Sequence, residues 1–367
     1  MAGALRDKMA EATDMPQNAP TGHKHHRARE ICGKVVKVLV PLAVTGVLVV
    51  WMLHKVNIGE VTRIMRGGVD YRYVLVMCVL VVLSHIIRGI RWGIQLRAAG
   101  IARMPWLAES VSIFGAYALN LVFPYLGEAW RCVYVSQRQK CKLSTVVGTD
   151  FGDRISDAVV IGLLILLAMW VAGPAIHEFM SNYEVGKWLE DTFGNGKIWM
   201  WTGAVTGAVA LACMLTRHTA FMQGVLTSAK RIWTGFAVLF HMRGIGMYLV
   251  LTAGIWVCYF LQTYVCFFAF GFTRELISEP GMMWGLIPGL VVFVFGSISI
   301  AVPSNGGLGP WNIAVMFALS LYGVSNSEGA AYSLVCWSFQ AITQVVAGLF
   351  SIGYMQWDRK RRRTTAA

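Results

Sequence analysis

Apolar residues in this chain gather into long blocks, which polar and basic segments separate. Six of these blocks are close to the roughly 20 residues that cross a bilayer core, and we predict that each forms a membrane-spanning helix. The blocks are residues 36–53, 73–92, 155–173, 198–216, 247–272 and 331–354. The pattern predicts an all-α fold class, a polytopic membrane protein with six to eight transmembrane helices.

Two further apolar blocks, 107–135 and 284–324, are interrupted by helix-breaking residues. Proline removes a backbone donor, and within a bilayer free backbone groups are tolerated only where protein buries them or where they line a wet cavity. We therefore predict two broken, re-entrant hairpins, a pairing that points to a transporter's binding site. The residues expected to form them are Pro124 and Gly127 in the first block and Pro303, Gly306, Gly307 and Gly309 in the second.

The loops predict the topology, because short cytoplasmic loops are enriched in Lys and Arg. The basic segments 131–142, 217–243 and 359–363 are placed inside, whereas the acidic 178–191 and the nearly neutral 272–283 are placed outside. Both termini then lie in the cytoplasm, and the two hairpins face each other from opposite leaflets, as in an inverted repeat. The block 284–324 is also long enough for two full crossings, which would keep the same topology and give eight crossings. The expected location is the bacterial cytoplasmic (inner) membrane.

The remaining segments divide the chain into a domain and two tails. Residues 1–34 are polar and lack a hydrophobic signal-peptide region, so we expect a disordered cytoplasmic tail. Residues 35–355 are expected to form one transmembrane domain, and residues 356–367 a polybasic cytoplasmic tail. Residues 57–69 carry basic side chains in a loop placed outside, and we predict an interfacial helix there.

Composition supports a membrane protein, since 56% of the residues are hydrophobic and 14% are charged. The formal net charge is +13. Many of the basic residues flank the spans, where they would set topology and attract anionic membrane lipid, so no nucleic-acid partner is expected. No metal site or cofactor is expected either. The eight cysteines form no C-x-x-C pair, and His23, His25 and His26 have no partner ligand nearby.

Ionisable residues at membrane depth are costly and mark candidate functional sites. Asp150, Asp153, Arg154 and Asp157 have the spacing i, i+3, i+4 and i+7, which gathers all four onto one face of a helix. Two further pairs of charged residues lie earlier in the chain, and the members of each pair are three residues apart: Arg88 and Arg91, then Glu128 and Arg131. Together the set has four residues of each sign, which can neutralise each other: Arg88, Arg91, Arg131 and Arg154 against Glu128, Asp150, Asp153 and Asp157.

Two interpretations of these charges remain open. In the first they form a paired network that pins helices together, or the arginines extend to the cytoplasmic headgroups. In the second they form a substrate-binding site for a lipid headgroup, because a guanidinium binds phosphate through two parallel donors and glycine lets backbone N–H groups approach an anion. In this hypothesis Arg88, Arg131 and Arg154 hold the phosphate, while Glu128, Asp153 and Asp157 orient them or engage a cationic headgroup. The neutral residues expected in the site are Asn120, Ser304 and Asn305.

Catalytic motifs are absent from the sequence. It contains no G-x-S-x-G, no H-E-x-x-H and no P-loop, so we expect no catalytic residues and no enzyme activity. Arg154 among the aspartates argues against a divalent metal. Without a nucleotide-binding motif, transport would be passive or coupled to an ion gradient, with buried carboxylates as candidate proton sites.

The chain resembles the flippase-type membrane region of lysylphosphatidylglycerol synthases and its stand-alone relatives over about residues 35–355. The residues that carry the resemblance are Asn120, Pro124, Gly127, Glu128 and Arg131, then Asp153, Arg154 and Asp157, then Pro303, Gly306, Gly307 and Gly309, followed by an apolar helix with Gly323 and Val324. The expected type is a stand-alone member, without the aminoacyltransferase domain. The resemblance implies a lipid translocase, with a phospholipid, aminoacyl-phospholipid, hopanoid or polyprenyl-linked lipid as substrate.

Two other functions are compatible with the same residues. The first is an intramembrane enzyme that acts on a lipid phosphate, with Glu128 or Asp153 as general base. The second is a non-transporting partner subunit of a lipid-modifying synthase, suggested by the basic stretch 359–363.

Overall fold

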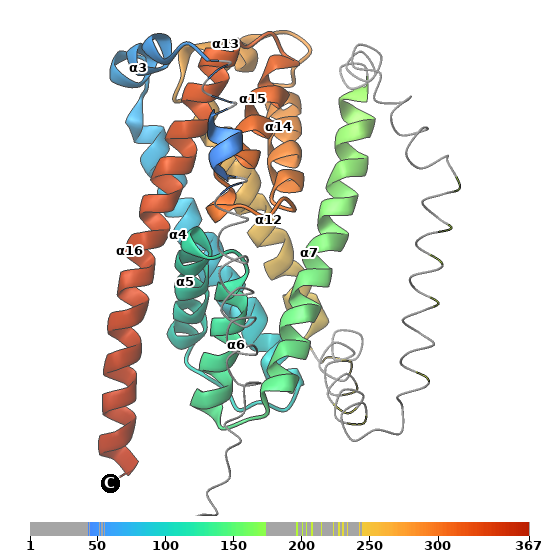
Figure 1. The fold of residues 1–367 in the computed structure, drawn as a ribbon, viewed down its shortest axis with the longest axis vertical. Helices are drawn as coiled ribbons and strands as arrows, with labels where there is room; N and C mark the ends of the chain where they lie inside the picture. The colour runs from blue at the N-terminus through green and yellow to red at the C-terminus, as the bar shows by residue number, and fades with distance from the viewer. Residues whose placement is uncertain are drawn as a thin grey trace, which may run out of the picture. The chain divides into compact units, whose positions relative to one another are not determined.

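A computed structural model describes residues 56–173 and 244–366, together with some positions in 43–54 and 196–242. Its regular elements are eleven helices in this described part, in agreement with the predicted fold class (Figure 1). Three predicted segments lie wholly or largely outside the described residues: the tail 1–34 and the spans 36–53 and 198–216.

Four of the described helices are long and apolar enough to cross a membrane. Each covers the greater part of one span predicted from the sequence. They are α4 (Tyr71–Ala98), α7 (Leu143–Val171), α12 (Ile245–Phe267) and α16 (Asn326–Ala366). Helix α12 ends before the predicted boundary at residue 272, and the short helix α13 (Gly271–Ser278) follows it.

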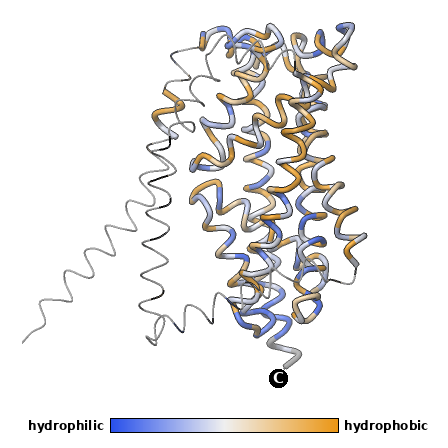
Figure 2. The backbone as a smooth tube through the Cα atoms, turned by 90° about the vertical axis from the view of Figure 1, so that its right-hand side faces the viewer, coloured by the Kyte–Doolittle hydropathy of each residue, from blue (hydrophilic) through white to orange (hydrophobic). Residues whose placement is uncertain are grey.

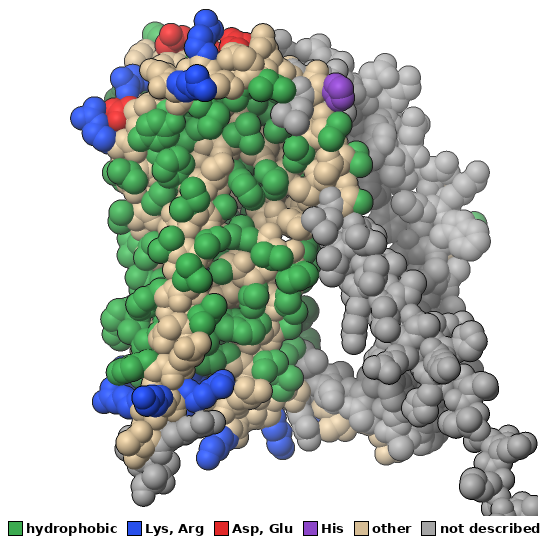
Figure 3. Space-filling view, turned by 60° about the vertical axis from the view of Figure 1, so that its left-hand side comes forward, with side chains coloured by type: hydrophobic (Ala, Val, Ile, Leu, Met, Phe, Trp, Pro, Cys, Tyr) green, Lys and Arg blue, Asp and Glu red, His purple; other side chains and the backbone are tan. Residues whose placement is uncertain are grey.

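The surface of these helices is suited to lipid. Between 11% and 39% of the most apolar stretch of each span is buried, so most of that apolar surface faces outward. Figure 3 shows hydrophobic side chains across the middle of the visible face, with Lys and Arg gathered at its two ends. Figure 2 shows hydrophilic residues gathered near the C-terminal end of α16. A helix that is apolar on its outward side is typical of a membrane span, and the protein is a multi-pass membrane protein.

Both predicted interruptions are present. The block 107–135 is divided at Pro124 into α5 (Trp106–Val122) and α6 (Leu126–Gln139). The block 284–324 is divided between α14 (Leu286–Ser299) and α15 (Pro310–Ser320), with the one-turn 3-10 helix η2 (Asn305–Gly307) between them. These four α-helices have 17, 14, 14 and 11 residues, each fewer than the roughly 20 that a full crossing needs.

Two apolar clusters hold the helices together at different levels. One joins α4, α12 and α16 through Val74, Phe267 and Tyr332. The other joins α4 to α5 through Trp92 and Ile113. Figure 1 shows α14 and α15 beside the N-terminal half of α16, and α5 and α6 at the level of its C-terminal half. The two interruptions therefore lie between the clusters, at the middle of the bundle.

The helix predicted at residues 57–69 is present as α3 (Ile58–Gly67). The Asn57 side chain accepts a 3.2 Å hydrogen bond from the Glu60 backbone N–H, which satisfies one of the free donors at the start of the helix. The apolar residue Val61 is buried and Arg63 is exposed, so the helix is amphipathic. This confirms the helix, and its position at a membrane interface stays a prediction.

Candidate functional site

Buried ion pairs join three helices beside the first interruption. Helix α4 contributes Arg88 and Arg91, which pair with Asp153 and Asp157 of α7. The Arg91 Nη2 atom lies 2.5 Å from Asp153 Oδ1 and 2.9 Å from Asp157 Oδ1. The i, i+3 and i+4 spacings place the charges of each helix on one face, as predicted, and in the structure these two faces meet.

Helix α6 completes this network. Arg131 pairs with Asp150, and its Nη2 atom lies 3.5 Å from Asp153 Oδ2. Asp153 thus faces three guanidinium groups, those of Arg88, Arg91 and Arg131. Side-chain exposure is 0% for Asp153 and 1% for Arg131. A buried charge is tolerated only when it is paired, so each member of this network depends on the others.

Aromatic and hydroxyl side chains that the sequence reasoning missed complete the surroundings of the network. Thr252 Oγ1 accepts a 3.3 Å hydrogen bond from Arg91 Nη1, and the Arg91 guanidinium lies 5.4 Å from the ring centroid of Tyr248. The Arg131 guanidinium lies 4.5 Å from the Trp92 ring. Cations over aromatic faces are stabilised, more so when they are desolvated. The one sequence signal was the four-residue spacing of Tyr248 and Thr252, which puts both on one face of α12.

The fourth arginine of the set is more accessible. Arg154 pairs with Glu128 of α6, and the side chains are 39% and 20% exposed. Asn120 of α5 holds this pair in place, since its Nδ2 donates to both Glu128 carboxylate oxygens at 3.1 Å. The Asn120 Oδ1 atom accepts a 2.8 Å hydrogen bond from the Gly127 N–H. One amide thereby ties α5 to the first turn of α6 across Pro124.

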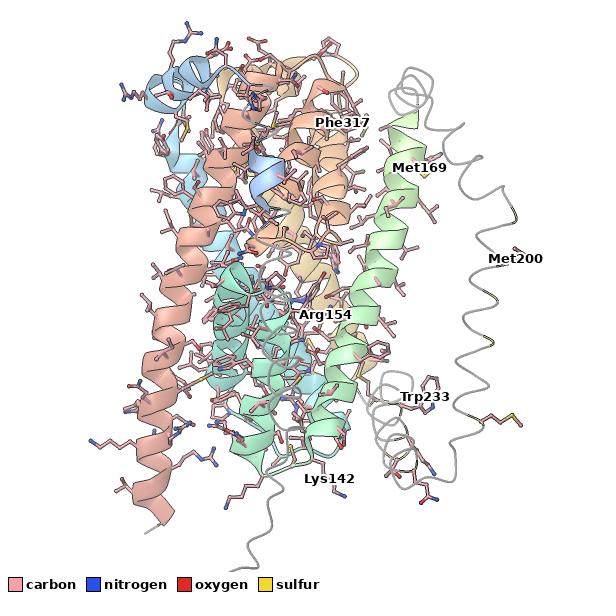
Figure 4. The ribbon with its side chains drawn as sticks, viewed as in Figure 1. Lys142, Arg154, Met169, Met200, Trp233 and Phe317 are labelled. Atoms are coloured by element: carbon pink, nitrogen blue, oxygen red, sulfur yellow. The ribbon has the colours of Figure 1, made fainter. Side chains whose placement is uncertain are left out.

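A cavity of about 310 Å³ lies against this accessible pair. The Arg154 side chain points from α7 toward the rest of the bundle (Figure 4). Tyr117, Trp256 and Tyr259 add an aromatic wall that the sequence did not predict. The predicted site residues that line the cavity are Arg88, Asn120, Pro124, Glu128, Arg154, Asp157, Ser304, Gly306 and Gly307. Those that do not line it are Arg91, Gly127, Arg131, Asp150, Asp153, Pro303, Asn305 and Gly309.

The second interruption forms part of the cavity wall and contacts the first directly. Asn305 Nδ2 donates a 3.2 Å hydrogen bond to the carbonyl of Val122, the last residue of α5. Gly306 has a φ of 58°, in the left-handed region, and a β-carbon added there would lie 2.6 Å from Leu121 Cδ2. The left-handed φ favours glycine, and a larger residue would also force the Leu121 side chain to move. The Gly306 carbonyl accepts a 2.9 Å hydrogen bond from Trp337 Nε1, which fixes the loop to α16.

Comparisons with known proteins identify the family. The family model of the lysylphosphatidylglycerol synthase transmembrane region matches residues 38–348. Searches of curated proteins and of solved structures gave no match. The matched range includes the buried network, the accessible Arg154–Glu128 pair and both interruptions. This chain belongs to the lysylphosphatidylglycerol synthase transmembrane region family.

Proposed function

We propose that this protein is a membrane lipid translocase that binds the headgroup of an anionic or aminoacylated phospholipid in the 310 Å³ cavity. The observation that carries the proposal is the Arg154–Glu128 pair, which lines the cavity and is the accessible part of an otherwise buried charge cluster. Membership of a family linked to lipid flipping supports it. The absence of catalytic sequence motifs favours translocation over lipid chemistry.

In this mechanism the lipid phosphate competes with Glu128 for Arg154. A guanidinium binds phosphate at least as well as carboxylate, so the exchange preserves the pairing of Arg154. The released Glu128 carboxylate, still hydrogen-bonded to Asn120, then accepts the ammonium group of an aminoacyl headgroup. We assign Arg91, Arg131, Asp150 and Asp153 a positioning role, because they lie behind the cavity wall and hold α4, α6 and α7 together.

The proposal also covers how the helices and the two termini are placed in the membrane. In the proposal, α5–α6 and α14–α15 are two broken hairpins that enter from opposite leaflets, since each helix is too short for a full crossing. Both termini are assigned to the cytoplasm and the protein to a bacterial inner membrane, on the distribution of basic loops. The headgroup would cross along the cavity between the hairpins while the acyl chains remain in lipid.

The test measures translocation in liposomes that contain the purified protein and a fluorescent phospholipid. Lipid that moves from the inner to the outer leaflet is detected as the fluorescence that an external quencher removes. Arg154→Gln removes one charge-assisted partner, worth about 1.5–3 kcal/mol. We therefore expect the apparent affinity for lipid to fall by about 10- to 100-fold, at an unchanged elution volume in detergent. The matched control is Arg63→Gln on α3, where the arginine is 81% exposed.

Two results would oppose the proposal. Wild-type rates in Arg154→Gln would show that the pair does not contact the substrate. A new lipid species in the recovered membranes, measured by mass spectrometry, would favour an intramembrane enzyme, and unchanged lipid is expected.

A further inference from the structure

A second, smaller compartment of about 160 Å³ adjoins the cavity. The two share Tyr117, Tyr259, Ser297, Ile300 and Gln340 as lining residues. Ligand sites usually enclose roughly 300–1,000 Å³, so the smaller space is suited to one part of a ligand whose remainder occupies the larger one. The smaller compartment is therefore a candidate for recognition of a defined portion of the headgroup.

Its lining has a different chemistry from that of the larger cavity. Among the described residues that form it, none is Asp, Glu, Lys or Arg. Aromatic rings make up much of the wall, and the polar groups are amides and hydroxyls, such as those of Gln262, Thr263, Ser297 and Gln340. Such a lining can hydrogen-bond a neutral ligand, but it offers no counter-ion for an ammonium group and no cation for a second phosphate.

His85 provides an unsatisfied polar atom at this site. The residue is 3% exposed, and its ring packs against Tyr117 with a centroid distance of 4.2 Å. Its Nε2 atom has no hydrogen-bond partner within the described part of the chain. A buried polar atom without a partner is destabilising, and proteins rarely retain one unless water or a ligand satisfies it.

The neighbours of His85 indicate which group Nε2 can bind. Ser84 Oγ donates its proton to the Val81 carbonyl at 2.7 Å, so it acts as acceptor in its 3.5 Å contact with His85 Nδ1. The proton of a neutral imidazole then lies on Nδ1, which leaves Nε2 as an acceptor. The missing partner is a donor. A hydroxyl group meets this requirement without bringing charge into the compartment, whereas a phosphate or carboxylate oxygen does not.

We infer that the compartment around His85 and Gln340 binds an uncharged cyclic polyol, a sugar or cyclitol ring that follows the phosphate in the lipid headgroup. The inference rests on the proposed function and specifies the substrate of the same site. The phosphate lies at Arg154, the ring packs between the aromatic walls, and one of its hydroxyls donates to His85 Nε2. The amides of Gln262 and Gln340 can donate to or accept from the other hydroxyls.

The test measures lipid binding separately from translocation, by native mass spectrometry of the full-length protein in detergent. Equal amounts of phosphatidylinositol, phosphatidic acid, phosphatidylglycerol and phosphatidylethanolamine compete for the protein. We expect phosphatidylinositol to be retained about fivefold or more over phosphatidic acid, the headgroup that ends at the phosphate. Soluble inositol 1-phosphate forms the same polar contacts without acyl chains. At the same concentration it is expected to displace less than half of the bound lipid.

Two variants test the residues. His85→Phe keeps the ring against Tyr117 and removes the acceptor, and Gln340→Leu removes the amide at similar volume. Each should reduce the preference for phosphatidylinositol over phosphatidic acid by at least about threefold. His85 does not line the larger cavity, so His85→Phe should also retain phosphatidic acid binding. His54→Phe, at an exposed histidine, is the matched control. His85→Phe should fold, because it removes an unsatisfied buried nitrogen, and an unchanged or higher melting temperature checks this.

The outcomes separate the inference from the proposed function. Equal retention of all four lipids, a preference for phosphatidylethanolamine, or a polyol preference that His85→Phe leaves intact would overturn the inference, even where translocation is observed. Full displacement by soluble inositol 1-phosphate would overturn the assignment to a lipid. A polyol preference that both variants reduce would support the inference even if liposomes showed no translocation, and that result would count against the proposed function alone.

Discussion

The side-chain amide of Asn305 donates a 3.2 Å hydrogen bond to the backbone carbonyl of Val122, across 183 residues of sequence. Val122 ends α5, and its carbonyl is one of those that no residue within the helix can satisfy. Asn305 begins the turn η2 in the other interruption. The interruption in the C-terminal half of the chain therefore supplies a capping group for α5, the helix that ends at the interruption in the N-terminal half.

Asn305→Ala tests whether this contact matters for function. The variant leaves the Val122 carbonyl unpaired, and we expect a loss of about 1 kcal/mol of stability together with slower translocation. Asn57→Ala, which removes the cap of α3, should cost a similar stability of about 1 kcal/mol without changing translocation. Melting temperature and liposome assays on both variants make the comparison. Equal translocation by the two would show that the contact is only structural.

Asp153 should be the most sensitive position of the buried network. Asp153→Asn removes the charge that faces Arg88, Arg91 and Arg131, and breaking a buried pair costs about 3–5 kcal/mol. We expect a large fall in melting temperature and poor recovery from membranes. Glu60→Gln, in an exposed pair with Arg63 on α3, should stay within about 0.5 kcal/mol of wild type. A stable Asp153→Asn protein would contradict the interdependence of the network.

Helices α5 and α6 approach each other closely at Gly127, so we expect Gly127→Ala to lower the stability of the protein. A β-carbon at Gly127 would collide with the Ala116 carbonyl, so the two helices must separate. Overpacking of this kind costs about 1–3 kcal/mol, and the cavity wall at Asn120 and Glu128 would shift with it. Gly162→Ala on α7 is the control, because nothing lies within 4 Å of its added carbon. It should be neutral or stabilising by up to about 1 kcal/mol, measured as melting temperature.

The two ends of α6 give a matched pair of backbone substitutions. Tyr125 precedes the helix with a φ of 63° and Lys140 follows it with a φ of 51°, both in the left-handed region that favours glycine. Tyr125→Gly and Lys140→Gly should each raise stability by up to about 1 kcal/mol, because they relieve the steric cost. Tyr125 lines the cavity and Lys140 does not. We therefore expect only Tyr125→Gly to reduce translocation, and equal activity of the two would exclude a role for the tyrosine ring.

Local periodicity was sufficient to predict part of this site. The angular position of a residue on a helix depends only on its number, so the common face of Asp150, Asp153 and Asp157 followed from their spacing and is confirmed. The breaks at Pro124 and around Gly306 were predictable for a similar reason, since proline and glycine change the backbone where they stand.

Packing between distant segments was not predictable. The contact of Arg91 with Thr252 depends on how α4 meets α12, and a single sequence holds no signal for that pairing. Four arginines with similar sequence surroundings also have different environments. Arg91 and Arg131 are enclosed by three helices, whereas Arg154 is 39% exposed beside the cavity. Burial thus differs among members of one set, and a single sequence holds no signal for that difference.

The equal numbers of acidic and basic groups in the cluster have an electrical consequence. Four guanidinium groups and four carboxylates sum to zero, and in the structure each is paired with a member of the set. A transmembrane voltage does work of about 2.3 kcal/mol per elementary charge for each 100 mV, and on a neutral cluster that moves as one body it does none. In the proposed mechanism the cluster as a whole adds no net charge, so the charge of the transported headgroup contributes directly to any voltage dependence of translocation.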